Sequence, residues 1–429
     1  MEESSLVNKL TIDRAKILGT GKYGIVYEGV WGENQVAIKR IPIDNVATSN
    51  EREVNALKKF DHENVIKLLQ VEEDKDFKCF VLELCKASLD QLFLKENDPK
   101  KYSGPVPPEA EVLLQLAKGL EHIHKNELVH RDIKPENVLI WVNPQTNQVL
   151  MKWADFGFSK QVNERGTFSM SGVKGTLHWL APELLALLDE YSSSENEIKK
   201  RGTVKSDVFA EGLVFGYFLS KGVHPFGTSS YQIPTNVQKK RPTNLPETKD
   251  IRKIIEQMLH KKPENRIASS DVVNLLINNR EIRTKKMFTL VAKKDPSVEE
   301  IKMLVREGVD INAKDKKGLT PLLQMAENKK GSGNALEIIN LLIQNGANVN
   351  SLDSKGKNAL LLLCDNNQNH QNENLKEIMG LLMQSGLNVT PETVTFFKEK
   401  YYKENRDEIL LLLDQQHPDE PVTKRMKFE

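Results

Sequence analysis

The chain has 429 residues, of which 39% are hydrophobic, so it is long enough for two or three domains with packed cores, and its composition argues against wholesale disorder. Its 61 lysine and arginine residues balance 60 aspartate and glutamate residues, which argues against a dedicated nucleic-acid binder. Three scattered cysteines, Cys79, Cys85 and Cys364, exclude a disulfide framework or structural zinc site and indicate a reducing, intracellular compartment.

The N-terminal part of the chain predicts a small strand-rich lobe. Residues 1–11 are polar, lack the apolar core of a signal peptide, and are expected to be flexible. The stretches "AKILGTGKYGIVYEGVW" and "QVAIKRI" then alternate apolar and polar residues on either side of the hairpin signal "GEN". Further on, "NEREVNALKKF" has helical spacing, and "CFVLELC" predicts a short strand.

From residue 107 the pattern becomes helical. The stretch "PPEAEVLLQLAKGLEHIHKN" starts with prolines and keeps an apolar stripe, and a second mainly helical region covers residues 207–279. Its run "VFAEGLVFGYFLS" is interrupted by Glu211 and falls short of the roughly 20 apolar residues of a membrane span, so we expect a buried helix. We also expect a hairpin turn at "NPQTNQ" (143–148) and a flexible surface insertion at "YSSSENEIKKRG" (191–202).

A glycine motif, "GTGKYGIV" (19–26), has the form G-x-G-x-x-G-x-V. Glycines allow a backbone to lie close over phosphates, although many glycine-rich hairpins share this pattern. Strand patterns on both sides argue against a Rossmann turn, which needs a following helix. In "VAIK" (36–39), Lys39 is either an edge-strand lysine or the cation that binds the α- and β-phosphates, with Glu53, or alternatively Glu51, as its partner.

A charged loop, "VHRDIKPEN" (129–137), is followed by "ADFGFSK". By itself this loop is equally compatible with a surface connection between a helix and a strand. In the catalytic interpretation, Asp132 accepts the proton of a substrate hydroxyl and Lys134 neutralises the transferring phosphoryl group. Asn137 and Asp155 are the candidate metal ligands, since two such oxygen donors together with substrate phosphates suit Mg²⁺.

These motifs and "APE" (181–183) follow one another in order over residues 12–280, and on them the chain resembles the eukaryotic protein kinases. The resemblance implies an α+β, bilobal kinase fold with a β-rich N-lobe and a helical C-lobe, and ATP and Mg²⁺ as cofactors. The lysine in "HRDIK" resembles that of serine/threonine kinases. The resemblance also implies that Asp207 braces the catalytic loop and that Arg266 pairs with Glu183.

Stretches such as "VLELCKASLDQ" and "RGTFSMSGVKGTLHWLAPELL" look most like the kinase module of the inositol-requiring kinase/endoribonuclease, the unfolded-protein sensor, and of ribonuclease L. That resemblance implies that Leu82 is the gatekeeper residue and that the backbone of Glu83 and Cys85 forms the hinge that contacts adenine. The residues expected to bind ATP are Leu18, Gly19, Thr20, Gly21, Lys22, Tyr23, Gly24, Ile25, Val26, Ala37, Lys39, Glu53, Glu83 and Cys85. We expect the chain to depart from this family in lacking the luminal sensor, the membrane span and a convincing nuclease segment, so a stress-sensing endoribonuclease is an alternative only.

The segment between Asp155 and Glu183 is rich in hydroxyl side chains, which on their own indicate only a solvated loop. Arg131, however, precedes Asp132 and in the kinase family offers a cation to a phosphorylated loop. We therefore expect phosphorylation of at least one of Thr167, Ser169 and Ser171, by autophosphorylation in trans within a homodimer. Thr176, which follows a glycine just before "APE", is expected to position substrate.

An internal repeat follows residue 280. The stretch "GVDINAKDKKGLTPLL" (308–323) is echoed by "GANVNSLDSKGKNALL" (346–361), and Gly308, Gly346 and Gly386 mark steps of 38 and 40 residues. The pattern resembles ankyrin repeats and implies an all-α module of degenerate repeats over residues 286–415, followed by a flexible tail at 416–429. Such a module is either a structural appendage or a surface that binds a protein partner.

The sequence thus predicts a serine/threonine protein kinase. Its expected partners are ATP, protein substrates, a protein bound by the ankyrin repeats and a second copy of the chain, with no membrane span and no nucleic acid. A nucleotide-binding scaffold is the alternative, but Lys39, Asp132 and Asp155 are all present, whereas pseudokinases usually lack one of them. We expect a cytoplasmic protein; the basic tail "TKRMKFE" (423–429) is either a solvated end or a nuclear-import signal.

Overall fold

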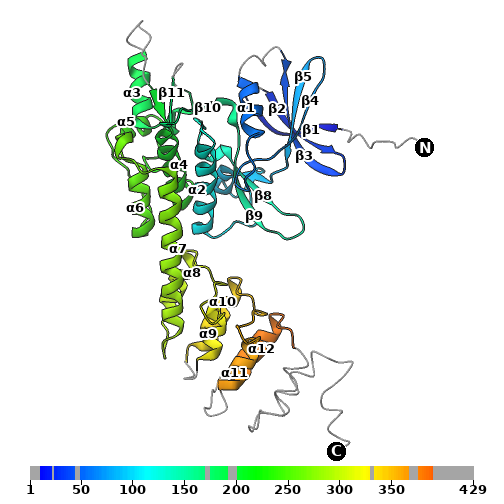
Figure 1. Cartoon of the computed structure of the whole chain (residues 1–429), viewed down its shortest axis with the longest axis vertical. Helices are drawn as coiled ribbons and strands as arrows, with labels where there is room; N and C mark the ends of the chain where they lie inside the picture. The colour runs from blue at the N-terminus through cyan, green and yellow to red at the C-terminus, as the bar shows by residue number, and fades with distance from the viewer. Residues whose placement is uncertain are drawn as a thin grey trace, which may run out of the picture. The chain divides into compact units, whose positions relative to one another are not determined.

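A computed structural model describes residues 10–21, 24–43, 49–169, 174–191, 201–328, 333–366 and 375–389 (Figure 1). The chain divides into two compact units, Met1–Ile277 and Asn278–Glu429. Helix α7 (Ser269–Val291) contributes residues to both, so the interval between the predicted kinase domain and the predicted repeats, residues 281–285, lies inside a continuous helix.

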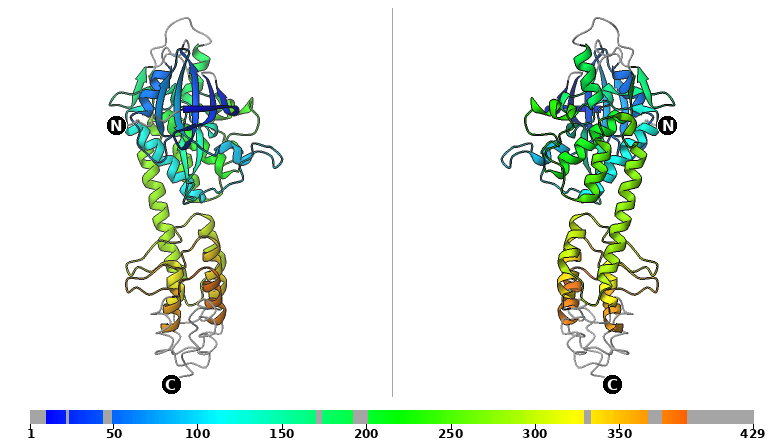
Figure 2. Two further views of the ribbon diagram at one scale, coloured as in Figure 1. Left: turned by 90° about the vertical axis from the view of Figure 1, so that its right-hand side faces the viewer. Right: turned by 90° about the vertical axis from the view of Figure 1, so that its left-hand side faces the viewer.

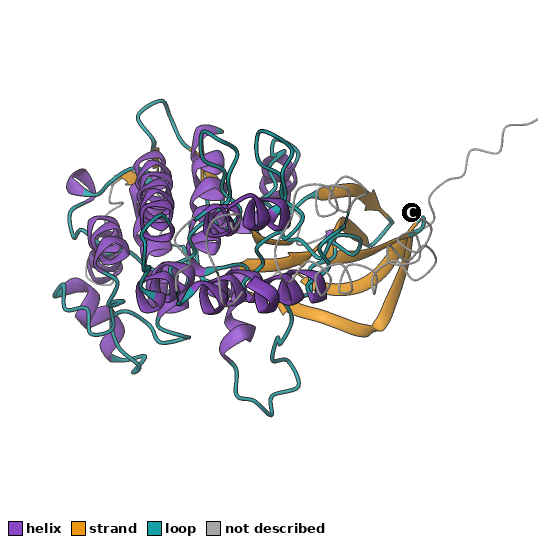
Figure 3. Ribbon diagram, turned by 90° about the horizontal axis from the view of Figure 1, so that it is seen from below, coloured by secondary structure: helices purple, strands orange, loops and turns teal. Residues whose placement is uncertain are grey.

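The first unit begins with an antiparallel five-stranded sheet in the order β1-β2-β3-β5-β4. Its elements are β1 (Leu10–Gly21), β2 (Gly24–Trp31), β3 (Asn34–Pro42), α1 (Ser49–Leu57), β4 (Leu68–Glu73) and β5 (Phe77–Glu83). The predicted hairpin at "GEN" is present, with Gly32 in the left-handed region (φ 63°) between β2 and β3. Val36, Ile38 and Val81 are fully buried in the sheet. Figure 3 shows the strands in orange and the helices in purple.

A mainly helical lobe follows. Its helices are α2 (Glu109–Lys125), α3 (Pro182–Tyr191), α4 (Lys205–Leu219), α5 (Gln232–Gln238), α6 (Lys249–Met258) and the start of α7, with short 3-10 turns at Leu89–Phe93, Pro135–Asn137, Phe156–Phe158, Leu177–Trp179 and Pro263–Asn265. Helix α4 is the expected buried helix: Phe209, Leu213 and Phe215 are almost wholly buried, and so is Glu211. Among the residues that the structure describes, no helix is long and apolar enough to cross a bilayer.

Short strands position the loops of this lobe. They are β6 (Ala87–Ser88), β7 (Leu128–Val129), β8 (Val138–Val142), β9 (Val149–Trp153), β10 (Lys160–Gln161), β11 (Thr167–Ser169) and β12 (Arg201–Thr203). The predicted turn at 143–148 joins β8 to β9, in which Val142 pairs with Val149. The predicted insertion at 191–202 differs from expectation at its end, because β12 pairs with β11; its polar composition hid this strand. Residues 192–200 lie outside the described part.

The second unit is built from helix pairs that share an apolar core (Figure 2). After α7 come α8 (Val298–Arg306), α9 (Pro321–Glu327), α10 (Ala335–Gln344), α11 (Ala359–Asn366) and α12 (Leu375–Gln384). Gly308, Gly346 and Gly386 all have positive φ after α8, α10 and α12, as the predicted repeat requires. The predicted repeat region beyond residue 389 and the tail at 416–429 lie outside the described residues.

Asparagine side chains join successive repeats of this second unit. Asn312 donates from Nδ2 to the carbonyl oxygen of Gly346 (2.9 Å) and accepts from the backbone N–H of Asn348 (2.8 Å). Asn350, 38 residues further on, makes the same two bonds to Gly386 (2.9 Å) and Asn388 (2.7 Å). The repetition of this bond pair explains why "VN" and "IN" recur at fixed places in the repeats.

Candidate active site

The glycine motif forms the tip of the β1–β2 hairpin, where Gly21 pairs with Gly24. A Cβ atom at Gly19 would meet no atom within 4 Å, and one at Gly21 would meet only a backbone oxygen at 3.9 Å. At Gly24, in contrast, a Cβ would come within 2.3 Å of the carbonyl oxygen of Arg40. The first two glycines therefore leave space beside the backbone, whereas the third is required by strand packing. Lys22 and Tyr23 lie outside the described residues.

Lys39 lies between two carboxylates from other parts of the sequence. Its Nζ lies 2.7 Å from Oε2 of Glu53 on α1 and 3.2 Å from Oδ1 of Asp155. Burial alone would lower the pKa of Lys39, but the two carboxylates outweigh it and raise that pKa above its usual value. Burial would likewise raise the pKa of Asp155, but Lys39 outweighs it and lowers that pKa. Lys39 is thus held as a cation, and Glu53 is its helical partner.

The residues expected to contact adenine lie at the end of β5. Leu82 pairs with Ala37 of β3, and Glu83 pairs with Val36. The side chain of Glu83 forms an ion pair with Lys152 of β9 (2.9 Å) and accepts from the backbone N–H of Lys67 (2.7 Å). Of the other expected nucleotide contacts, Leu18 is exposed, Thr20, Ile25 and Val26 lie on the β1–β2 hairpin, and Cys85 is half-buried, with burial raising the pKa of its thiol.

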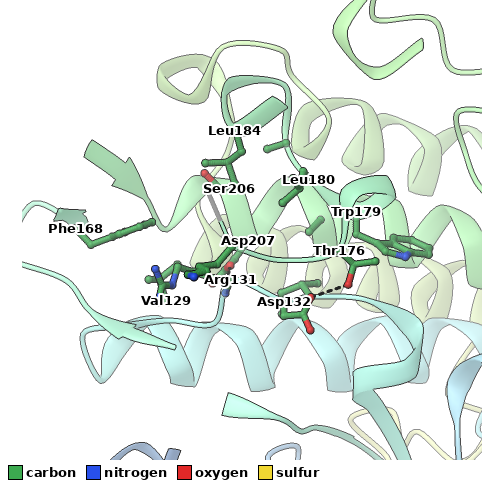
Figure 4. A pocket seen from close by; sticks show the side chains of 14 residues that line it. Val129, Arg131, Asp132, Phe168, Thr176, Trp179, Leu180, Leu184, Ser206 and Asp207 are labelled. Carbon is green, nitrogen blue, oxygen red and sulfur yellow. Dashed lines mark hydrogen bonds between the residues drawn. The ribbon is translucent and has the colours of Figure 1, made fainter. Parts of the chain in front are cut away.

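Three side chains converge on the carboxylate of Asp132, and Figure 4 shows the one from Thr176. The hydroxyl of Thr176 donates to Oδ1 of Asp132 and accepts from Nζ of Lys134, each at 3.0 Å. Lys134 also lies 3.0 Å from Oδ2 of Asp132. Asn137 donates from Nδ2 to the same Oδ2 (3.0 Å) and to the carbonyl oxygen of Asp132 (2.8 Å). Asp132 is therefore fixed from both sides, with a cation and a hydroxyl beside it.

Helix α4 braces this loop through Asp207. Asp207 accepts from the backbone N–H groups of His130 (2.7 Å) and Arg131 (2.9 Å). The ring of His124 lies 3.1 Å from the same carboxylate. Because Asp207 is almost fully buried, these bonds hold the backbone immediately before Asp132 in place.

The bidentate pair implied by the kinase resemblance is also present. The guanidinium of Arg266 donates to both carboxylate oxygens of Glu183, at 2.9 and 3.0 Å. The Arg266 side chain is completely buried, so the end of the activation segment is fastened to the segment that precedes α7.

The two candidate metal ligands lie at the two ends of the β8–β9 hairpin, Asn137 just before β8 and Asp155 just after β9. The backbone N–H of Ala154, next to Asp155, donates to the carbonyl oxygen of Asn137 (2.9 Å). The Asp155 side chain is 45% exposed, and its backbone adopts a left-handed conformation (φ 62°). A carboxylate and an amide oxygen that share one region with Lys39 fit a hard divalent cation that also binds nucleotide phosphates.

The three expected phosphorylation sites have different surroundings. The hydroxyl of Thr167 donates to Oδ1 of Asn163 (2.9 Å). Ser169 ends β11, opposite Arg201 in the β11–β12 register, and Ser171 lies outside the described residues. Thr176 stands apart from these sites, beside Asp132.

Some contacts in this region were not foreseen from the sequence. They include the His124–Asp207 bond, the Lys152–Glu83 ion pair and the burial of Phe168 in the activation segment. A lysine inside the apolar strand "VLMKW" is a signal for the ion pair, because a buried lysine needs a counter-charge. The residue opposite Phe168 is Gly202 on β12, and no local pattern in the sequence identifies it.

Comparison with known proteins agrees with this geometry. Residues 12–276 match the family model of the protein kinase domain, and residues 288–393 match that of ankyrin repeats in three copies. The expected combination of an α+β kinase fold with an all-α repeat module is thereby confirmed.

Several curated proteins are similar to part of this chain. The human serine/threonine-protein kinase/endoribonuclease IRE2 is 37% identical over 235 residues, which are 54% of this chain and 24% of that protein. Caenorhabditis elegans serine/threonine-protein kinase/endoribonuclease ire-1 is 31% identical over 277 residues (62% and 27%). The Schizosaccharomyces pombe sensor for unfolded proteins in the ER, ire1, is 34% identical over 257 residues (55% and 23%). The chain thus spans about a quarter of the length of these relatives.

Proposed function

This chain belongs to the protein kinase family, and we propose that it transfers the γ-phosphoryl group of ATP to serine and threonine hydroxyls. The observation that carries the proposal is the cluster around Asp132, in which Lys134 and Thr176 both lie within 3.0 Å of its carboxylate. The named relatives, which are serine/threonine-protein kinases, support the choice of acceptor.

Each residue of the cluster has a role in the proposed reaction. Asp132 accepts the proton of the substrate hydroxyl, whose oxygen forms the new bond to the γ-phosphorus while the bond to the β-phosphate oxygen breaks and ADP leaves. Lys134 neutralises charge on the transferring group, and Lys39 binds the α- and β-phosphates. The backbone of Gly19 and Gly21 covers the phosphates, and the hinge at Glu83 and Cys85 bonds adenine.

Asn137 and Asp155 would hold Mg²⁺, which when bound shields the phosphate charges and orients them. Asn137 has a second task, since its Nδ2 also fixes Asp132. Asp155 is at the same time kept ionised by Lys39, which leaves its carboxylate ready to bind a cation.

The direct test compares wild-type protein with Asp132→Asn in Mg-ATP and a generic basic protein substrate. We expect phosphate incorporation by the wild type only, with nucleotide binding equal in both. Binding without incorporation by the wild type would contradict the kinase and favour the nucleotide-binding scaffold.

We further propose that the activation segment is autophosphorylated at one or more of Thr167, Ser169 and Ser171, in trans between two copies of the chain. Mass spectrometry after incubation with ATP tests the sites, and mixing a tagged Asp132→Asn chain with wild type tests transfer between copies. Equal phosphate on wild-type and Asp132→Asn protein, each incubated alone, would reject autophosphorylation.

We also propose that the ankyrin repeats bind a protein partner. Replacing residues 278–429 with an inert module of equal length tests this, since unchanged partners and activity would reject partner binding.

We place the protein in the cytoplasm, with the nucleus as the alternative through residues 423–429. The relatives' names also include an endoribonuclease; cleavage of a labelled hairpin RNA by the purified chain would add that activity, and intact RNA would dismiss it.

A further inference from the structure

The activation segment is fastened to the chain just before α4 by a short antiparallel strand pair. In the β11–β12 register, Thr167 lies opposite Thr203 and Phe168 lies opposite Gly202. A turn prepares this pairing, since the side chain of Asn163 accepts from the backbone N–H of Thr167 (3.0 Å). The N–H of Val204 then donates to the carbonyl oxygen of Gly166 (3.1 Å) and closes the strand pair.

Phe168 is the buried residue of this strand pair. It is only 4% exposed and packs with Val129, Val162 and Val204 in a small apolar cluster separate from the main core. Its ring lies on the backbone of Gly202, where a Cβ atom would come within 2.1 Å of the ring. The absence of a side chain at position 202 is therefore what allows the ring to be buried.

Arg131 connects this cluster to the catalytic loop. Its guanidinium carbon lies 5.4 Å from the centre of the Phe168 ring, and its Nε donates to the carbonyl oxygen of Phe158. Its own carbonyl oxygen lies beneath Gly175, where a Cβ would approach it to 2.7 Å. Arg131 thus contacts both described arms of the activation segment, and it is the residue before Asp132; Figure 4 shows Phe168 and Arg131 on one side of Asp132.

We propose that Phe168, seated on Gly202, is a positioning residue that anchors the activation segment and, through Arg131, aligns Asp132 and Thr176 for phosphoryl transfer. This inference rests on the proposed kinase function and deepens it. Phe168 touches neither nucleotide nor substrate in this scheme. Its removal should therefore lower phosphoryl transfer while nucleotide affinity stays unchanged.

The experiment uses the full chain, treated with phosphatase, with four variants. Phe168→Ala removes the anchor, and Gly202→Ala pushes the ring out from the other strand. Phe168→Leu restores an apolar side chain. Thr203→Val is the matched control in the same strand, because the Thr203 hydroxyl has no hydrogen-bond partner among the described residues.

We expect Phe168→Ala and Gly202→Ala each to lower kcat/KM for a basic protein substrate by about 100-fold, the effect of a small displacement of catalytic groups. The dissociation constant of a fluorescent ATP analogue should stay within about twofold of wild type, since a buried contact remote from the nucleotide is changed. Phe168→Leu should recover most of the activity, and Thr203→Val should match wild type. The Phe168→Ala/Gly202→Ala double variant should be no worse than either single variant, because both remove one contact.

Hydrogen exchange in an Asp132→Asn background provides a readout that does not need catalysis. The amides of residues 163–169 should be protected in this protein and exchange faster once Phe168→Ala is added. Unchanged protection, or additive losses in the double variant, would overturn the proposal. If the wild-type protein binds ATP but transfers no phosphate, the proposed kinase function is wrong, and so is the catalytic role given to Phe168. If the wild type and Phe168→Ala are equally active, only the proposed role of Phe168 is wrong.

Discussion

Nζ of Lys152 lies 2.9 Å from Oε1 of Glu83, and only 6% and 14% of the two side chains are exposed. The same oxygen of Glu83 accepts from the N–H of Lys67, just before β4. One carboxylate therefore joins the end of β5, where the hinge begins, to β4 on one side and to β9 of the helical lobe on the other.

Lys152→Met should weaken this joint. The uncompensated carboxylate should lower the free energy of unfolding by about 3 kcal/mol, as when one partner of a buried pair is removed. The hinge backbone should then shift against adenine, so KM for ATP should rise about tenfold, equivalent to roughly 1.4 kcal/mol, with kcat little changed. Lys152→Arg is the matched control, and adding Glu83→Gln to Lys152→Met should recover stability. A KM equal to or below that of wild type would contradict the prediction.

The hydroxyl of Thr176 bridges Lys134 and Asp132, so its removal should disturb both. Thr176→Val keeps the shape of the side chain and should reduce kcat by about 10- to 100-fold, because the catalytic groups lose their fixed geometry. Thr176→Ser keeps the hydroxyl and should stay close to wild type in the same steady-state assay. Equal kcat values for the two variants would show that the bridge has no catalytic role.

Glu211 is completely buried in α4, and neither of its carboxylate oxygens has a hydrogen-bond partner among the described residues. Burial, and secondarily the nearby Asp207, raises the pKa of Glu211 well above its usual value. The unfolded chain therefore loses this proton at a lower pH than the folded chain does. The contribution of Glu211 to the free energy of unfolding is therefore greatest below a pH of about 4.5. It falls by up to roughly 1.4 kcal/mol per pH unit as the pH rises from the pKa of the unfolded chain to the higher pKa of the folded chain.

Glu211→Leu should consequently stabilise the first unit, and more so at pH 8 than at pH 5. Glu211→Gln serves as a second variant, since it removes the titration and keeps a polar group. Urea unfolding followed by tryptophan fluorescence measures both. A stability difference from wild type that is independent of pH would contradict the titration of Glu211, and a destabilised Leu variant would indicate a partner for the carboxylate.

Asn350→Ala should remove both bonds between its repeat and the next. We expect the second unit to lose about 1–2 kcal/mol, the sum for two exposed hydrogen bonds, while kinase activity stays unchanged. Asn345→Ala is the matched control, since the Asn345 side-chain amide donates to the carbonyl oxygen of Leu341 in its own repeat. Thermal unfolding with hydrogen exchange of residues 335–389 separates the two variants, and equal effects would reject the special role of Asn350.

Local sequence rules were sufficient for much of this architecture. The hairpin at "GEN", the strand "CFVLELC", the helix at 109–125 and the repeat glycines all depend on neighbours within a few residues, and each is found in the structure. The Lys39–Glu53 pair was expected, whereas the bond from Lys39 to Asp155 was not, because no periodicity in the sequence places residues 116 positions apart together.

Features that depend on tertiary contacts were missed. Strand β12 follows a polar stretch and forms because Phe168 provides it with a partner, which a local pattern cannot show. The Lys152–Glu83 pair joins two strands from different sheets, so neither residue indicates the other. Helix α7 passes without a break through residues 281–285, because helical spacing continues where the composition changes.

The three glycines of the "GTGKYGIV" motif carry different kinds of information. Gly24 is dictated by the carbonyl oxygen of Arg40 and would be needed in any chain that folds this sheet, with or without a nucleotide. Gly19 and Gly21 meet no such barrier, and in the proposed function it is the nucleotide lying against the backbone that keeps them free of side chains. In a descendant that no longer binds a nucleotide, Gly19 and Gly21 should be replaced freely by other residues, whereas Gly24 should remain glycine. Under the proposed function, the motif therefore serves ligand binding at its first two glycines and folding at the third.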